Sequence, residues 1–166
     1  PSGSFEFARG ECDGLHPGQT AEIRRNGEFV GYIGAIHPQL QKKLGISQTV
    51  YLFQVNVAAM RAGKVPAFTE LSKYPELRRD IAVIIDREIE AGTVQKAVKA
   101  AAGSDLINLR LFDIYEGKGI DTKRKSLALG LTFQHSSRTL NEDEVNVCVE
   151  KVIKALETQF AATLRN

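Results

Sequence analysis

The sequence predicts an α+β protein in which a small mixed antiparallel sheet segment is followed by a βαββαβ domain. Two observations in the second half favour this class. Residues 126–134 alternate large apolar and small or polar side chains, as a half-buried strand does. Residues 145–160 carry apolar side chains at the spacing of an amphipathic helix. In the first half, Asn26-Gly27 is a dipeptide typical of a tight β-hairpin.

Residues 1–66 are expected to hold short strands and one short helix. Glycines and prolines recur in residues 1–18, which predicts an irregular start. Residues 21–25 and 28–36 are the predicted arms of the hairpin, and residues 39–44 the predicted helix after His37-Pro38. Residues 49–57 are apolar on both faces, so they are expected to form an interior strand, or one covered by a segment missing here.

Residues 67–73 are the predicted linker between two domains. Gly63, Pro66 and Pro75 interrupt this region, and no apolar period is sustained through it. The sequence begins abruptly at Pro1, so we expect it to be a piece of a longer protein. The second domain is expected to span residues 74–166.

The second domain has a clear order of predicted elements. Strands are expected at residues 80–86, 106–115, 126–134 and 162–165, with helices at 93–102 and from the Asn141 cap to Phe160. Strand, helix, strand, strand, helix, strand is the split βαβ, or ferredoxin-like, arrangement. Both helices should cover the sheet face that bears Leu127, Leu129 and Leu131. The opposite face then carries small side chains, on which a flat ligand could dock: Ala82, Ser126, Ala128, Gly130 and Thr132.

Residues 111–117 carry the most specific site signal. Asp113 and Tyr115 share one face at the end of a strand, beside a glycine-lined loop, while Phe112 and Ile114 share an apolar face that is expected to pack. A bulge near Leu111 would reconcile this phase with the rest of the strand. A phenol beside a carboxylate is suited to a nucleobase. The alternative is structural: Asp113 forms a turn and Tyr115 covers the rim of the core.

Composition excludes several classes of function. The net charge of +2 argues against a strongly basic, nonspecific nucleic-acid binder. Cys12 and Cys148 lie far apart and form no metal or redox pair, which fits a reducing, cytosolic setting. We find no phosphate-binding loop, no catalytic set and no metal-ligand spacing, and no apolar run is long enough to span a bilayer.

Two basic stretches leave alternatives open. Arg78-Arg79-Asp80 is either a surface ion pair or an RNA phosphate contact. Lys123, Arg124 and Lys125 lie in a loop that is usually solvated, although beside a base-binding face they could neutralise phosphates.

Several motifs, taken together, resemble one family. They are His16-Pro17-Gly18-Gln19, the glycines and His37-Pro38 that follow, Tyr74-Pro75 with Arg78-Arg79-Asp80, the stretch 111–119, Lys125-Ser126-Leu127-Ala128, and Arg138-Thr139-Leu140 before Glu142. In this order the chain resembles the C-terminal part of the beta subunit of bacterial phenylalanyl-tRNA synthetase. The mitochondrial enzyme shares the last domain, but residues 16–38 favour the bacterial beta subunit.

The resemblance implies a function and an assembly. Residues 1–66 would end a module that is similar to a class II synthetase core but lacks catalytic residues, and residues 74–166 would be the ferredoxin-fold anticodon-binding domain. The parent enzyme would be a cytoplasmic α2β2 heterotetramer whose alpha subunit charges tRNA(Phe) with ATP and magnesium, so this piece needs no cofactor or metal of its own. The resemblance places anticodon contacts at Asp113, Tyr115, Ala82 and Arg165. The rival interpretation is a regulatory domain that binds amino acids, because ferredoxin-like folds do so at strand edges.

Overall fold

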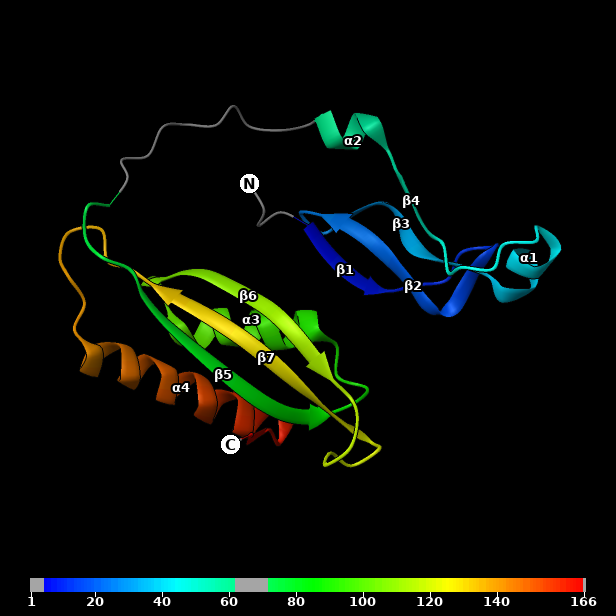
Figure 1. Ribbon diagram of the computed structural model, residues 1–166. Helices are drawn as coiled ribbons and strands as arrows, with labels where there is room; N and C mark the ends of the chain where they lie inside the picture. Colours follow the sequence, from blue (N-terminus) through cyan, green and yellow to red (C-terminus); the bar gives the residue numbers. More distant parts are fainter. Residues whose placement is uncertain (1–4, 62–71, 166) are drawn as a thin grey trace. The chain divides into compact units, whose positions relative to one another are not determined.

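The computed structural model describes residues 5–61 and 72–165, and the chain divides into two compact units, residues 1–67 and 68–166 (Figure 1). Most of the predicted linker 67–73 lies outside the described residues. Within the described residues each unit has its own four-stranded sheet, and all strand pairs given for both sheets are antiparallel.

The sheet of the first unit has the strand order β1-β2-β3-β4. Its elements are β1 (Phe5–Arg9), β2 (Leu15–Arg25), β3 (Glu28–Ile36), α1 (Pro38–Lys43), β4 (Tyr51–Val55) and α2 (Val57–Arg61). The predicted hairpin is confirmed: Asn26 and Gly27 have φ angles of 52° and 83°, as a type I′ turn requires. The ring Nδ1 of His37 accepts a hydrogen bond from the backbone N–H of Gln39 at 3.2 Å, which caps α1 at the predicted start.

Two expectations for this unit are wrong. Residues 1–18 are not irregular throughout, because β1 pairs with β2 over its whole length and β2 begins at Leu15. Pro17 and Gly18 lie where the β2–β3 register shifts, so they mark an interruption inside a strand rather than the absence of one. For residues 49–57 the interior strand is the wrong alternative, because β4 ends the sheet in the described part of the chain and Phe53 is 71% exposed. A covering segment absent from this sequence stays a prediction.

The second unit confirms the predicted βαββαβ order. Its elements are β5 (Leu77–Asp86), α3 (Ala91–Ala102), β6 (Leu106–Tyr115), β7 (Arg124–Phe133), α4 (Glu142–Phe160) and β8 (Thr163–Leu164). The strand order in the sheet is β6-β7-β5-β8, so the two central strands are β7 and β5. Asn141 caps α4 in a capping box with Glu144, as its sequence predicts.

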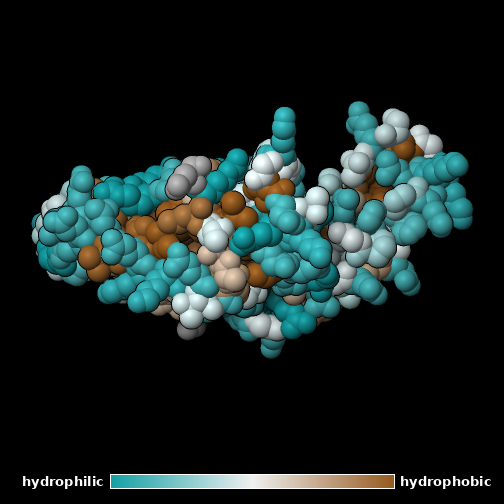
Figure 2. Space-filling view, turned by 90° about the horizontal axis from the view of Figure 1, so that it is seen from below, coloured by the Kyte–Doolittle hydropathy of each residue, from teal (hydrophilic) through white to brown (hydrophobic). Residues whose placement is uncertain are grey.

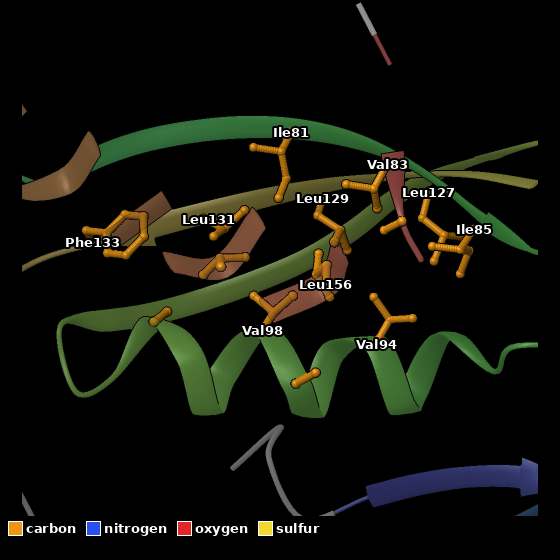
Figure 3. Close-up of a cluster of buried hydrophobic side chains, with 14 of the residues drawn as sticks. Ile81, Val83, Ile85, Val94, Val98, Leu127, Leu129, Leu131, Phe133 and Leu156 are labelled. Atoms are coloured by element: carbon orange, nitrogen blue, oxygen red, sulfur yellow. The ribbon is translucent and has the colours of Figure 1, made fainter. Parts of the chain in front are cut away.

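The core of the second unit lies between one sheet face and the two helices. Figure 3 shows Leu127, Leu129 and Leu131 of β7 beside Val94 and Val98, which point from α3 toward the sheet. All five of these side chains are fully buried. From outside, Figure 2 shows mostly hydrophilic residues with a band of hydrophobic residues among them. Since both helices pack on the leucine face, no helix among the described residues of the second unit covers the other sheet face.

The predicted bulge in β6 is confirmed, but the packing expected of Phe112 and Ile114 is not. The β6–β7 register shifts between Leu111 and Asp113, so the strand changes phase there. Leu109 and Leu111 are the β6 residues that pack against the core in this part of the strand, whereas Phe112 and Ile114 are 45% and 50% exposed. The phase change is nevertheless what brings Asp113 and Tyr115 onto the uncovered face.

Candidate functional site

The uncovered face of the second sheet is organised in four rows of side chains that run across β6, β7 and β5. Residues directly opposite each other in antiparallel strands point to the same face, so the pairing register assigns each row. The rows are Tyr115, Ser126 and Ile84; then Asp113, Ala128 and Ala82; then Arg110, Gly130 and Asp80; and finally Asn108, Thr132 and Arg78. We call this surface the open face, and number its rows in that order.

The second row is a low floor with one charged end. Ala82 and Ala128 project only methyl groups and lie directly opposite each other on the two central strands. Asp113 completes the row on β6 and is exposed. Its carboxylate has no side-chain hydrogen bond or ion pair within residues 5–61 and 72–165. An exposed carboxylate at the end of a flat apolar floor can accept hydrogen bonds from a planar ligand that lies on it.

Tyr115 is fixed at the end of the first row by the loop that follows it. Its hydroxyl donates a hydrogen bond to the backbone carbonyl of Lys118 at 3.1 Å. A Cβ on Gly117 would lie 2.8 Å from that hydroxyl oxygen, so a side chain there would push the ring away. Gly117 therefore allows the loop to fold closely onto the phenol and hold it in place.

Arg165 reaches the same place from the opposite edge of the sheet. Its backbone N–H donates to the carbonyl of Ala82 at 2.9 Å, which continues the β8–β5 pairing by one residue. Its guanidinium carbon lies 4.8 Å from the centre of the Tyr115 ring, a cation–π contact. The side chains that meet in this way start from strands separated by β7 and β5. Small residues between them leave room for the contact.

The structure thus brings together Asp113, Tyr115, Ala82 and Arg165, the four residues to which the sequence resemblance assigns anticodon contacts. They come from β6, β5 and the end of β8, and all lie on the open face. The arrangement offers an aromatic ring, an arginine, a carboxylate and a methyl floor. Such a set can stack a planar group and hydrogen-bond its edge.

The three basic loop residues do not form one cluster on the open face. Arg124 donates to the carbonyls of Ile84 at 2.9 Å and Ala161 at 2.8 Å, and so ties the end of α4 to β5. Lys125 lies opposite Ile85, whose side chain is fully buried on the helix side of the sheet. Lys123 is exposed in the loop. Of the three, Lys123 is the one whose side chain is neither half-buried nor held by the protein backbone in the described structure.

Sequence reasoning missed one feature of the open face and gave another only as one of two alternatives. Arg78 and Asp80 form an ion pair, with Nε to Oδ1 at 3.0 Å, which is one of the two alternatives stated for that stretch. Arg110 was not considered, although it lies on the third row beside Gly130. Side chains alternate along a strand, so the even-numbered residues of β5 share a face. This alternation could have assigned Arg78 and Asp80 to the open face. Arg110 could be assigned only once the position of the bulge in β6 was known.

A second polar group surrounds the start of α4. A cleft of about 410 Å³ is lined there by residues that include Asp105, Arg138, Glu144 and Lys151. The Arg138 guanidinium donates to the Glu144 carboxylate at 2.8 Å, which lowers the pKa of Glu144 and raises the pKa of Arg138. The Asn141 backbone N–H also donates to Glu144. These contacts stabilise the helix start, and they pair two of the charged groups that line this cleft.

Within residues 5–61 and 72–165, no three His, Cys, Asp or Glu side chains gather closely enough to hold a metal ion. The helices described for this chain include none that is long and apolar enough to cross a membrane.

Comparison with known proteins identifies the family that each part of the chain matches. Residues 72–165 match the family described as ferredoxin-fold anticodon binding domain, and residues 2–57 match the family described as phenylalanyl tRNA synthetase beta chain CLM domain. The chain is 53% identical over 161 residues to the phenylalanine–tRNA ligase beta subunit of Pseudomonas fluorescens strain Pf0-1. It is 44% identical over 162 residues to the same subunit of Coxiella burnetii and 40% identical over 162 residues to that of Colwellia psychrerythraea.

These alignments cover almost all of this chain but a small part of each relative. They span 97% of the chain with the Pseudomonas and Coxiella proteins and 98% with the Colwellia protein, against 20% of each relative. The chain therefore spans about a fifth of the length of the curated relatives it matches. The family match covers the whole second unit as described, including all four rows of the open face. The chain belongs to the ferredoxin-fold anticodon binding domain family, joined here to a segment of the phenylalanyl-tRNA synthetase beta chain type.

Proposed function

We propose that the second unit binds the anticodon of tRNA(Phe), as part of the beta subunit of a phenylalanine–tRNA ligase, and that the open face is its RNA-binding surface. One observation carries this proposal. Asp113, Tyr115, Ala82 and Arg165 come from three separate strands and converge on one uncovered face, where the aromatic ring and the arginine already contact each other. Aromatic rings and arginine planes are the groups on which proteins stack unpaired RNA bases.

Each residue has a defined role in this proposal. A base stacks on the Tyr115 ring in place of the Arg165 guanidinium. The displaced guanidinium then donates hydrogen bonds to the RNA through its planar set of N–H groups. Asp113 accepts a hydrogen bond from a base edge, and the Ala82–Ala128 floor lets that base approach the sheet closely. Lys123 is the loop residue that contacts a phosphate.

The whole enzyme is assigned by the same reasoning. The relatives are beta subunits of a ligase. We assign phenylalanine activation and transfer to an alpha subunit in a cytoplasmic α2β2 class II synthetase that uses ATP and magnesium. Residues 1–66 would belong to a non-catalytic module of the beta subunit and 74–166 to the anticodon-binding domain. The rival function, an amino-acid-binding regulatory domain, is not favoured by the family match.

The test compares two classes of ligand and a set of variants, with one assay for each ligand class. The affinity of the 166-residue chain for labelled tRNA(Phe) is measured by fluorescence anisotropy, and binding of free phenylalanine and other amino acids by calorimetry. Tyr115→Ala should lose about 1–3 kcal/mol of tRNA binding, the usual range for a stacked base. Tyr115→Phe should stay near wild type, because the hydroxyl bonds the Lys118 carbonyl rather than facing a ligand.

The matched control is Tyr51→Ala, which removes a tyrosine that is 65% exposed in the first unit. It should bind tRNA as the wild type does. Binding of an amino acid without any binding of tRNA would replace the proposal by its rival. Equal tRNA affinity of Tyr115→Ala and wild type would show that the open face is not the RNA surface.

A further inference from the structure

The open face continues past the proposed anticodon residues into two charged rows. The third row holds Arg110, Gly130 and Asp80, and the fourth holds Asn108, Thr132 and Arg78. Neighbouring rows lie about 7 Å apart, because each strand advances about 3.4 Å per residue and alternate residues share a face. These rows are continuous with the base-binding rows, and no residue in them has a role in the function proposed above.

Arg78 is held flat against the sheet by Asp80. Its Nε and a terminal nitrogen donate to the two carboxylate oxygens of Asp80, at 3.0 and 3.3 Å. A Cβ added to Gly130 would lie 3.1 Å from an Asp80 carboxylate oxygen and 3.3 Å from a terminal nitrogen of Arg78. The pair therefore rests over the one position of β7 where no side chain intervenes. Gly130 fixes the pair close to the backbone and fixes where the Arg78 guanidinium lies.

Arg110 lies on the other side of Gly130 and is left unpaired. Its side chain is exposed and makes no hydrogen bond or ion pair with any residue in the described part of the chain. The residue opposite it is glycine, so no cross-strand partner balances its charge. The nearest carboxylate across the sheet, that of Asp80, is two strand spacings away at about 10 Å and is already paired with Arg78. The third and fourth rows thus carry two guanidinium groups and one carboxylate.

A solvated arginine on an ordinary sheet face is the simplest alternative. Two observations argue against it here. Gly130 on a central strand lets the Arg78–Asp80 pair lie close to the backbone, which fixes a second guanidinium next to the residue opposite Arg110. Arg110, which has no ion-pair partner in the described residues, also lies directly beside the row that holds Asp113, Ala128 and Ala82. A guanidinium binds phosphate oxygens through two parallel hydrogen bonds, so a chain of RNA that places a base on that row would bring its backbone within reach.

Resting on the function proposed above, we propose that Arg110 binds a backbone phosphate of the tRNA anticodon loop, with the Arg78–Asp80 pair bordering the same phosphate site. Phosphate contacts position the RNA and carry no sequence information. Arg110 therefore sets the register of the loop on the sheet, while Asp113 and Tyr115 contact the bases. Asp80 orients Arg78 and keeps the net positive charge of the site small.

The experiment measures tRNA(Phe) affinity of the 166-residue chain as a function of salt concentration. Arg110→Gln should bind about fivefold more weakly at 0.1 M salt, and its slope of log affinity against log salt should be shallower by about 0.7, the value for one phosphate contact on a single strand. Arg110→Lys should keep most of the slope, because it keeps the charge. Tyr115→Ala, measured alongside, should lose affinity with an unchanged salt slope.

The matched control is Lys154→Gln, which also removes one exposed positive charge, but from α4. Melting curves of all variants establish that the fold is retained. A second series repeats wild type and Arg110→Gln with tRNA in which each anticodon base is changed in turn. The affinity ratio between the two proteins should stay constant within about twofold, as a phosphate contact requires.

Each outcome separates the two proposals. If Tyr115→Ala weakens binding but Arg110→Gln matches Lys154→Gln, the phosphate site is wrong and the anticodon proposal stands. A loss that appears for one anticodon base alone would make Arg110 a base contact and overturn the phosphate assignment. If the wild-type chain does not bind tRNA, both proposals fail.

Discussion

Tyr115 shows how single residues prepare the open face. Its hydroxyl is bonded to a loop carbonyl, its ring contacts the Arg165 guanidinium, and Gly117 leaves space for the loop to close on it. None of these contacts adds to the core, because the ring lies on the face away from the helices. These contacts order Tyr115 with little effect on the free energy of unfolding. They hold its ring in a position where a base can stack on it.

Arg165→Ala tests whether this arginine serves the ligand or competes with it. If the guanidinium passes from the ring to the RNA, its removal should weaken tRNA(Phe) binding about 3- to 30-fold, equivalent to about 0.6–2 kcal/mol for a lost cation–π or charged hydrogen-bond contact. Anisotropy titration measures this effect, and Arg165→Lys should lie between the variant and wild type. Tighter binding by Arg165→Ala would mean that the arginine merely occupies the site of a base.

Helix α4 is the element whose start is most strongly specified. The Asn141 side chain accepts from the Glu144 N–H at 2.8 Å, and the Glu144 carboxylate accepts in return from the Asn141 N–H at 3.0 Å. Val145, Val152 and Leu156 then carry the buried stripe that packs on the sheet. Because α4 also leads into β8, the position of Arg165 depends on this helix.

Loss of the Asn141 cap should lower the free energy of unfolding of the second unit. Asn141→Ala is expected to lower the free energy of unfolding of the second unit by about 1 kcal/mol, the usual cost of removing an N-cap side chain. Urea unfolding followed by circular dichroism gives the value. Asn108→Ala, which changes an exposed asparagine on β6, is the control and should have a smaller effect. Equal stability of Asn141→Ala and wild type would contradict the role given to the capping box.

The Arg138–Glu144 pair predicts a pH dependence. The hydrogen bond from Arg138, followed by that from the Asn141 backbone, lowers the pKa of Glu144 in the folded chain. A carboxyl with a lowered folded pKa stabilises the fold above its unfolded pKa of about 4.3, and this contribution disappears as pH falls through the folded value. The melting temperatures of wild type and Glu144→Gln should therefore differ near pH 7 and converge in acid. The control is Glu150→Gln, and a difference that is independent of pH would refute the pair's contribution.

At the scale of the whole molecule, the proposed function gives this chain a role in binding and assigns catalysis to another subunit. The described residues contain neither a phosphate-binding loop nor a group of three metal ligands, and the relatives are about five times longer. We expect the 166-residue chain to show no ATP–pyrophosphate exchange with phenylalanine. The exchange assay is compared with a full-length ligase from one of the relatives as the positive control. If this chain shows exchange above the no-enzyme blank, the result contradicts the assignment of catalysis to another subunit.

The sequence by itself determined the elements whose signal is local. Alternation in residues 126–134, the apolar period of α4 and its capping box depend on residues within a few positions of each other, so the βαββαβ order and the helix-covered face followed from pattern alone. The Asn26-Gly27 turn is of the same kind, since its positive φ angles depend on those two residues. The family motifs added Asp113, Tyr115, Ala82 and Arg165 without any geometry.

Tertiary structure alone decided how distant residues meet. Whether β4 lies inside a sheet or at its edge depends on which strands pair, and two apolar faces are compatible with both. The contact between Arg165 and Tyr115 depends on the order of the strands and on the bulge in β6. The same two features place Arg110 beside Gly130, without an ion-pair partner among the described residues. These features result from hydrogen bonds between strands far apart in sequence, which set the register. A one-residue change of register turns every following side chain to the other face, so no local pattern could have fixed which β6 side chains share the open face with Arg165.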